Sequence, residues 1–431
     1  MTKLRTALLL ASTLLGAVLL RASLLVLNAV PFNADETIVA LMARHILRGE
    51  RPWFFYGQAY MGSLDAYLVA GAFKLMGESV LAIRMIQIAL FAATLVTSYI
   101  VAQRITDSSQ TASLTVLLLA FPPVLLTLYT TVSLGGYGEA LLIGNLLLWL
   151  GHRLGGEDRH RVWLWATWGV AAGLGFWVFG LVLIYAVPVA LWLLYRVLRA
   201  SAKTSTSLLT HPILRFTLLA LGFALGSLPW WLGNLGRIGT GMGELFGTAI
   251  RSTATASGFL GNVGARAFNF FVLGLSALFG LRFPWSAAGP PLWLGVPALA
   301  LYLGALGYAG QRTVGRLRAE VVNTPTAPVS GPRHTQTRIR YPSGDALLWG
   351  IWVTLFFGFI LTPFGGDPSG RYFLPLYVPL SIFTAEALVA LQKHVRGWAW
   401  TLLGLVLALN LVGTAQAALD YVVEDWLAEK M

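Results

Sequence analysis

The feature that most limits how this chain can fold is a series of apolar runs, most of them close to spanning length, that recurs along nearly the whole sequence. A helix of about 20 apolar residues spans the bilayer core, whereas strands of a membrane barrel show alternating segments of about 10 residues, and we find none of these. Only 11% of the 431 residues are charged, and the mean hydropathy is +0.71. The pattern predicts an all-α polytopic membrane protein, with one transmembrane domain over residues 1–431 and about 11 spanning helices.

The charges indicate how these helices are oriented. The net charge is +12, and cytoplasmic loops of membrane proteins collect Lys and Arg, so no nucleic acid partner is needed to explain it. Lys3 and Arg5 precede the apolar run of residues 6–30, which we interpret as an uncleaved first span with a cytoplasmic N-terminus. The apolar residues 162–195 lie between basic flanks, which predicts two short spans that turn near Trp177. The chain has no Cys, which excludes disulfides and thiol chemistry.

Three connecting segments stand out from the spans. Residues 31–78 form a predicted extracytoplasmic loop, and residues 233–291 form a second one that is rich in Gly. Within the second loop, the apolar residues 268–281 are too few to span a membrane, so we expect an interfacial or re-entrant piece. A long connection of this kind often closes over a site, and we interpret it as a lid over the acceptor. Residues 311–345 are basic and rich in Pro, which predicts a cytoplasmic loop.

The first outer loop carries a helix start with two acids. Asn33 is a good N-cap, and Glu36 stands three residues later like a capping-box partner. Apolar residues then recur at helical spacing and predict an amphipathic helix along the membrane surface: Ile38, Leu41, Met42 and Ile46. A second amphipathic piece is expected at residues 62–76. A role in capping the helix explains the presence of Glu36 as well as a catalytic role does. The cap does not need Asp35. An acid held at the membrane surface could serve as a general base.

These residues resemble a known family. A first span, then Phe32-x-x-Asp35-Glu36, an amphipathic helix and Gly49-x-x-Pro52-Trp53 resemble the first outer loop of GT-C glycosyltransferases. The pattern is most similar to the family-39-like branch, which includes protein O-mannosyltransferases and lipid A aminoarabinose transferases. Two further matches are Gly77-x-Ser79 with Arg84 at the second span, and Arg371-Tyr372-Phe-Leu-Pro375 late in the chain. The resemblance covers the overall layout of the spans.

The resemblance implies an inverting transfer on the extracytoplasmic face of the plasma (inner) membrane. The donor would be a sugar on a polyprenyl phosphate, and the acceptor a hydroxyl of a lipid, glycan or protein. Carried over by position, Asp35 is the general base, and Glu36 is its neighbour or a metal contact. Some members of the superfamily use a divalent metal and others do not, so a need for Mg²⁺ or Mn²⁺ stays open.

Such a reaction has two further requirements. A leaving phosphate needs a cation aimed at it, and the candidates are Arg84 and Arg371, the latter beside Tyr372. Snorkelling at the membrane interface also explains such arginines. The sugar needs hydrogen-bonding and flat apolar groups, for which the outer turns offer Tyr56, Gln58, Tyr60, Asp65, Tyr137 and Glu139. Each of these is also an ordinary residue for a loop or an interface.

Two other functions remain open from the sequence. The chain could be a transporter or flippase of lipid-linked sugars, or a non-catalytic assembly partner. A transporter is expected to bury its functional charges near the midplane, whereas most acids here fall in predicted outer loops. Glu386 lies within a late span and is either functional or part of a contact between helices.

Overall fold

The computed structural model describes residues 3–201, 212–245, 259–322 and 344–430, and this part of the chain contains helices and no strand. A single antiparallel bridge joins Phe54 and Gly62. The helices of the first half are α1 (Lys3–Val26), α2 (Ala34–Leu47), α3 (Leu64–Met76), α4 (Val80–Thr106), α5 (Ser109–Ala120), α6 (Val124–Tyr129), α7 (Tyr137–Gly155), α8 (Val162–Val178) and α9 (Leu183–Ser201). Those of the second half are α10 (Pro212–Gly226), α11 (Leu228–Gly233), α12 (Ile238–Leu245), α13 (Phe259–Phe268), α14 (Leu275–Leu278), α15 (Leu292–Val322), α16 (Asp345–Leu361), α17 (Tyr377–His394) and α18 (Arg396–Lys430).

Many of these helices suit a membrane. Within the described residues, six are long and apolar enough to span a bilayer, and five shorter apolar helices accompany them. The predicted all-α polytopic class is confirmed. The turn expected near Trp177 is present, because α8 ends at Val178 and α9 begins at Leu183. Pro122 and Pro123 separate α5 from α6, as expected of residues that cannot continue a helix.

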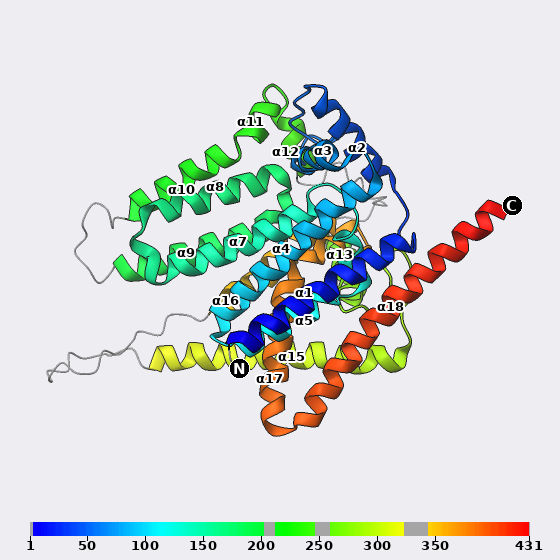
Figure 1. Cartoon of the computed structure of the whole chain (residues 1–431). Helices are drawn as coiled ribbons and strands as arrows, with labels where there is room; N and C mark the ends of the chain where they lie inside the picture. The colour runs from blue at the N-terminus through cyan, green and yellow to red at the C-terminus, as the bar shows by residue number, and fades with distance from the viewer. Residues whose placement is uncertain (1–2, 202–211, 246–258, 323–343, 431) are drawn as a thin grey trace.

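The helices form a bundle with two different ends (Figure 1). Helices α2, α3, α11 and α12 gather at one end, which we call the site end. The start of α1 lies at the opposite end, which we call the far end. The core between the two ends is lined with large aromatic side chains, and the fully buried ones include Trp165, Trp168, Trp230, Tyr185, Phe373 and Phe383.

Helices α8 and α10 lie side by side and run in the same direction (Figure 1). Gly169 and Gly173 of α8 press against the backbone of α10, while Gly222 and Gly226 of α10 press against the backbone of α8. A Cβ atom at any of these four positions would collide with a carbonyl of the other helix. Spacings of this small-xxx-small kind let helix backbones approach closely in membranes, where tight packing replaces the hydrophobic effect.

Helix α2 begins and ends as expected, but it buries a different stripe. Asn33 accepts a hydrogen bond from the backbone N–H of Glu36 (3.0 Å), and Gly49 beyond the helix has a φ of +99°. Val39, Met42 and Ala43 are buried, whereas Leu41 is 44% exposed. Several overlapping stripes fit helical spacing, and the packing of α2 on α3 selects one of them.

The apolar run before the Gly-rich loop is divided at Ser227 into α10 and α11. The connecting segments differ from the prediction in two places. Residues 259–278 are helical with a π-helical middle, Asn269–Gly274, rather than only a short piece at 268–281. Helix α15 continues to Val322, so the first part of the predicted 311–345 loop is helical. Most of the remainder of that loop lies outside the described residues.

Candidate active site

The two adjacent acids at the start of α2 point into different surroundings. Glu36 is fully buried, and Arg84 of α4 donates to both of its carboxylate oxygens (3.0 and 2.9 Å). The same guanidinium donates to the backbone carbonyls of Val30 and Pro31 (3.1 and 2.9 Å). This fork fastens the start of α2 to α4 and satisfies both charges. Asp35, one residue earlier, is exposed and has no ion pair among the described residues.

Asp35 instead interacts with the charge of Arg371, which lies far away in the sequence. Partial burial raises the pKa of the Asp35 carboxyl, and the positive charge of Arg371 opposes that shift. Arg371 opens the short helical turn Arg371–Leu376, and its Nε lies 2.7 Å from Oδ2 of Asp367. The fold therefore brings together the predicted base and the predicted phosphate-binding cation.

Tyrosines line the space around Arg371. Tyr60, Tyr129, Tyr137 and Tyr372 all lie close enough to interact with its charge. The rings of Tyr129 and Tyr137 meet edge to face at 4.8 Å, and Tyr137 meets Phe179 in the same way at 4.8 Å. The Arg371 guanidinium lies 5.0 Å from the centre of the Tyr372 ring. This cluster combines hydroxyl groups with flat apolar faces, as recognition of a sugar requires. Tyr60 and Tyr129 are partly exposed, whereas Tyr137 and Tyr372 are buried.

The Gly-rich stretch 233–291 contacts both sides of this site. Asn234 donates to the carbonyl of Ala59 (3.1 Å), and Glu244 accepts from the N–H of Ala59 (2.7 Å). Ala59 precedes Tyr60, so α11 and α12 hold the tyrosine on the first loop. The segment carrying Tyr60 is also tied to α8, because Trp177 Nε1 donates to the carbonyl of Trp53 (2.8 Å).

The second half of that stretch holds the segment that carries Arg371. Arg266 donates to the carbonyl of Ile360 (3.1 Å), and Asn269 donates to that of Gly365 (2.8 Å). Arg282 donates to the carbonyls of Pro368 and Leu273, so it joins the π-helical segment to the turn before Arg371. The described parts of the predicted lid thus brace the site from two sides. Residues 246–258 of that loop lie outside the described residues.

Asp65 and Glu139, both predicted to contact the sugar, are buried. Asp65 accepts hydrogen bonds from Ser133 and from Gln87 (3.0 Å). Burial raises the pKa of Asp65 to about 6; the hydrogen bond from Ser133 opposes this shift, and the charge of Glu36 adds to it. Neither carboxylate oxygen of Glu139 has a hydrogen-bond partner among the described residues. Both acids are buried, and their contact with a sugar stays a prediction.

The other predicted residues divide between the site and the surface. Tyr56 bonds with His45 (2.8 Å) and donates to Glu50 (3.2 Å), and no interaction with Arg371 or Asp35 is among its described contacts. Gln58 precedes Tyr60 in the same turn, and its side-chain oxygen is buried without a described partner.

Three residues near Arg371 or Tyr60 were not among the sequence candidates: Tyr129, Asp367 and Glu244. Of these, only Asp367 could have been found from the sequence, because it stands four residues before the candidate Arg371.

Arg21, a costly charge inside the first span, has no carboxylate partner in the described structure. It donates to the Thr130 hydroxyl (2.7 Å) and lies 3.6 Å from the centre of the Phe91 ring. Thr130 follows Tyr129, so Arg21 supports the end of α6 at the site.

The described residues do not form a ready-made metal centre. No group of three or more His, Asp or Glu side chains is arranged to hold one within the described residues, and Glu36 is already paired with Arg84. The predicted metal contact of Glu36 therefore finds no support in this geometry.

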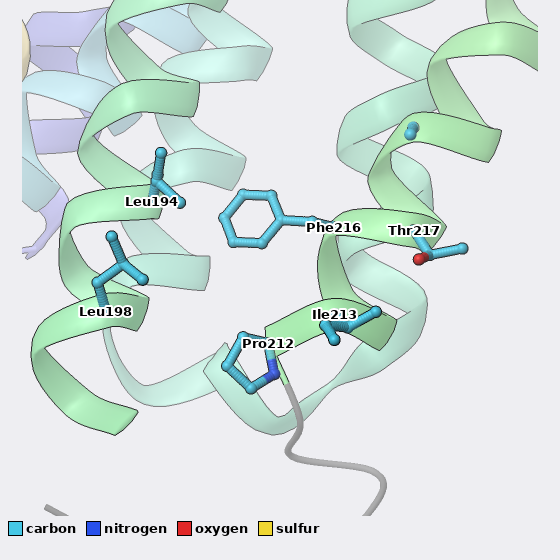
Figure 2. Close-up of a pocket in the computed structure, with 7 residues that line it drawn as sticks. Leu194, Leu198, Pro212, Ile213, Phe216 and Thr217 are labelled. Carbon is cyan, nitrogen blue, oxygen red and sulfur yellow. The ribbon is translucent and has the colours of Figure 1, made fainter. Parts of the chain in front are cut away.

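A groove of about 390 Å³ lies elsewhere, between α9 and α10, where Phe216 points toward Leu194 (Figure 2). Its lining contains no titratable side chain, so the groove suits a hydrocarbon chain and not a catalytic reaction. The lining residues are Leu194, Leu198, Pro212, Ile213, Phe216, Thr217 and Ala220.

Comparison with known proteins identifies the fold. No protein-family model matches the chain, and no curated protein sequence does. ArnT from Cupriavidus metallidurans, solved bound to undecaprenyl phosphate, is similar with 16% identity and a TM-score of 0.56. The match covers 92% of this chain and 62% of ArnT.

Archaeal enzymes are similar too. The Archaeoglobus fulgidus oligosaccharyltransferase in its apo form matches with 13% identity and a TM-score of 0.59, over 97% of this chain and 56% of the enzyme. Oligosaccharyltransferase AglB from the same organism, in complex with an inhibitory peptide and a dolichol-phosphate, matches with 13% identity and a TM-score of 0.55. That match covers 95% of this chain and 56% of AglB, so the chain spans less than two thirds of the length of each of these proteins. The chain has the multi-pass membrane fold of the GT-C glycosyltransferases.

Proposed function

We propose that this protein is an inverting membrane glycosyltransferase that moves a sugar from a polyprenyl-phosphate donor to an acceptor hydroxyl. The observation that carries the proposal is that Asp35 and Arg371, far apart in the sequence, lie within electrostatic reach of each other, with tyrosines beside Arg371. The donor class is supported by the solved neighbours, which were bound to undecaprenyl phosphate and to a dolichol-phosphate. The acceptor is a hydroxyl of a lipid, glycan or protein.

Asp35 acts as the general base in this reaction. Its carboxylate accepts the proton of the acceptor hydroxyl while the hydroxyl oxygen attacks the anomeric carbon from the side opposite the phosphate. The bond from that carbon to the phosphate oxygen breaks, and polyprenyl phosphate leaves with the electron pair, so the configuration inverts. Partial burial raises the pKa of Asp35, which makes the carboxylate a stronger base than one in water.

Arg371 stabilises the charge that develops on the leaving phosphate. A preorganised guanidinium can donate two parallel hydrogen bonds to a phosphate, and its charge matters more where water is partly excluded. The ion pair with Asp367 keeps Arg371 at the site. Arg84 has a different task here, because its contacts with Glu36, Val30 and Pro31 fix the start of α2 and so position Asp35.

The reaction would take place on the extracytoplasmic face of the plasma (inner) membrane. On this proposal the site end is extracytoplasmic and the N-terminus is cytoplasmic. Basic residues at the far end agree with that orientation, since Arg312 and Arg316 of α15 lie close to the start of α16. No step of the proposed reaction uses a metal.

The test compares the wild-type protein with Asp35→Asn, purified in detergent and given radiolabelled polyprenyl-phosphate sugars with membrane extract as the acceptor source. We expect transfer by the wild type and a loss of about 10²–10⁴ in rate for the variant, because a positioned base contributes that much. Glu50→Gln is the matched control, since it replaces an exposed acid of the same loop by its amide.

Three outcomes are informative. Equal transfer by both proteins would remove Asp35 from the role of base. Binding of the donor without transfer of any sugar would favour a transporter, a flippase or an assembly partner. A loss confined to Asp35→Asn, with unchanged thermal stability and donor binding, supports the proposal.

A further inference from the structure

Glu244 places a second carboxylate beside the candidate active site. It lies in α12, and its Oε2 accepts a hydrogen bond from the N–H of Ala59 (2.7 Å). The side chain is partly exposed, and it forms no ion pair with any described residue. Its negative charge is therefore available to whatever occupies the neighbouring space.

Tyr60 shows where that charge acts. Burial raises the pKa of the Tyr60 hydroxyl; Arg371 opposes this shift, while Glu244 and Asp35 add to it. The contacts agree with this: Tyr60 follows Ala59, which Glu244 holds, and its ring lies 6.4 Å from that of Phe179, which packs against Tyr137 near Arg371. Tyr60 therefore joins Glu244 to the part of the site that contains Arg371.

The local charges do not cancel. Asp367 pairs with Arg371 and also interacts with the charge of Arg282, whereas Asp35 and Glu244 have no ion pair among the described side chains. These two cations and three carboxylates leave a net negative charge. In the proposed reaction the sugar lies between Asp35 and Arg371, because its anomeric carbon must be reached by the acceptor and its phosphate must reach the arginine. The sugar ring therefore lies next to Tyr60 and Glu244.

We propose that the site selects glycosyl groups that carry no carboxylate, and that Glu244 makes this selection by repelling acidic sugars. This inference rests on the proposed glycosyl transfer. Glu244 Oε1 can accept hydrogen bonds from the hydroxyls of a neutral sugar and can attract an ammonium group. A uronic acid would bring a third carboxylate next to Asp35 and Glu244, and like charges brought together in a partly desolvated site strongly disfavour binding.

The experiment measures binding rather than transfer, so it needs no acceptor. The full-length protein in detergent is titrated with polyprenyl-phosphate glucose, polyprenyl-phosphate glucuronic acid, a polyprenyl-phosphate amino sugar and polyprenyl phosphate alone. The first two probes differ only at C6. Wild type is compared with Glu244→Gln, whose amide oxygen can still accept from Ala59, and with Glu50→Gln as a control of equal charge change.

We expect wild type to bind the glucosyl probe at least about tenfold more tightly than the glucuronyl probe, with a smaller ratio at high salt. In Glu244→Gln the ratio should fall toward one, and the advantage of the amino sugar should shrink. Glu50→Gln should behave like wild type, and no variant should change binding of polyprenyl phosphate alone.

Two results would overturn the inference while leaving the proposed function intact. One is equal binding of the glucosyl and glucuronyl probes by wild type. The other is a ratio that Glu244→Gln leaves unchanged. Failure of all four probes to bind, the bare carrier included, would instead overturn the proposed function and this inference together.

Discussion

Arginine and carboxylate side chains meet at both ends of the bundle, but they are paired differently. At the far end, Arg312 of α15 donates to Asp345 of α16 (2.8 Å) and to Glu386 of α17, while Arg316 donates to Asp345 (2.8 Å). The Asp345 side chain is only 1% exposed and that of Glu386 is 7% exposed. At the site end, Asp35 and Glu244 have no described ion pair.

The two ends differ in what their charged side chains do: those at the far end hold helices together, whereas Asp35 and Glu244 at the site end are left free for a substrate. Glu386, which the sequence left open as functional or structural, joins α17 to α15 through Arg312. Glu36 and Arg84 repeat that arrangement at the site end. Charges outside such buried pairs can interact with a ligand. Asp35 and Glu244 have no described partner, and the side chain of Arg371, although paired with Asp367, is 38% exposed. The predictions below test this division, from the largest expected effect to the smallest.

Breaking the far-end cluster should cost stability and little activity. Arg312→Ala leaves Glu386 as an unpaired buried carboxylate, so we expect the free energy of unfolding to fall by about 3–5 kcal/mol. Denaturation in mixed micelles measures this change, and transfer assays on the folded fraction should give a normal rate. The double variant Arg312→Met with Glu386→Leu should recover much of the loss. A fall below about 1 kcal/mol would show that the cluster behaves like an exposed pair.

Removing the site-end cation should instead cost activity. We expect Arg371→Ala to lower kcat by about 10²–10³, because a group aimed at developing charge contributes that much. The kcat of Arg371→Lys should lie between those of wild type and Arg371→Ala, since lysine keeps the charge but loses the bidentate fork. Transfer kinetics measure both variants, with thermal unfolding as the check on folding. Unchanged kinetics in Arg371→Ala would mean that another group binds the phosphate.

Asp65 should make stability depend on pH. Its pKa is about 6 in the folded protein and near 4 in an unfolded chain, so the folded state binds more protons between these values. Stability from this group is therefore greatest at low pH and decreases as pH rises from about 4 to about 6, by about 2–3 kcal/mol. Asp65→Asn should remove this part of the dependence, as measured by unfolding across that pH range. An identical slope in the variant would assign the dependence to other groups.

The exposed pair of Arg44 and Glu78 should matter least. The two side chains are 54% and 45% exposed and lie 2.7 Å apart. Arg44→Ala should change the free energy of unfolding by no more than about 1 kcal/mol, and salt should reduce even that. A larger loss would show that exposure alone does not distinguish the structural pairs from the others.

The sequence by itself determined the class of the fold and the start of the helix that carries Asp35. Apolar runs fix the helices because a backbone inside lipid must satisfy its own hydrogen bonds. Asn33 fixes the start of α2 through a contact only three residues away. Asp35, Arg371, Tyr60, Tyr137 and Tyr372 were predicted from their residue types and positions, and the fold brings them together.

Only the tertiary structure decided which of two adjacent acids stays free. Arg84 lies 48 residues after Glu36 and pairs with it. Asp35 therefore stays free to interact with the charge of Arg371. Tyr129 and Glu244 likewise join the site through contacts between distant helices. Pairings of this kind depend on how helices pack and rotate, and the spacing of residues along one segment does not encode them. Local hydrogen bonding can therefore be predicted from the sequence, whereas the division into paired and free charges requires the packed bundle.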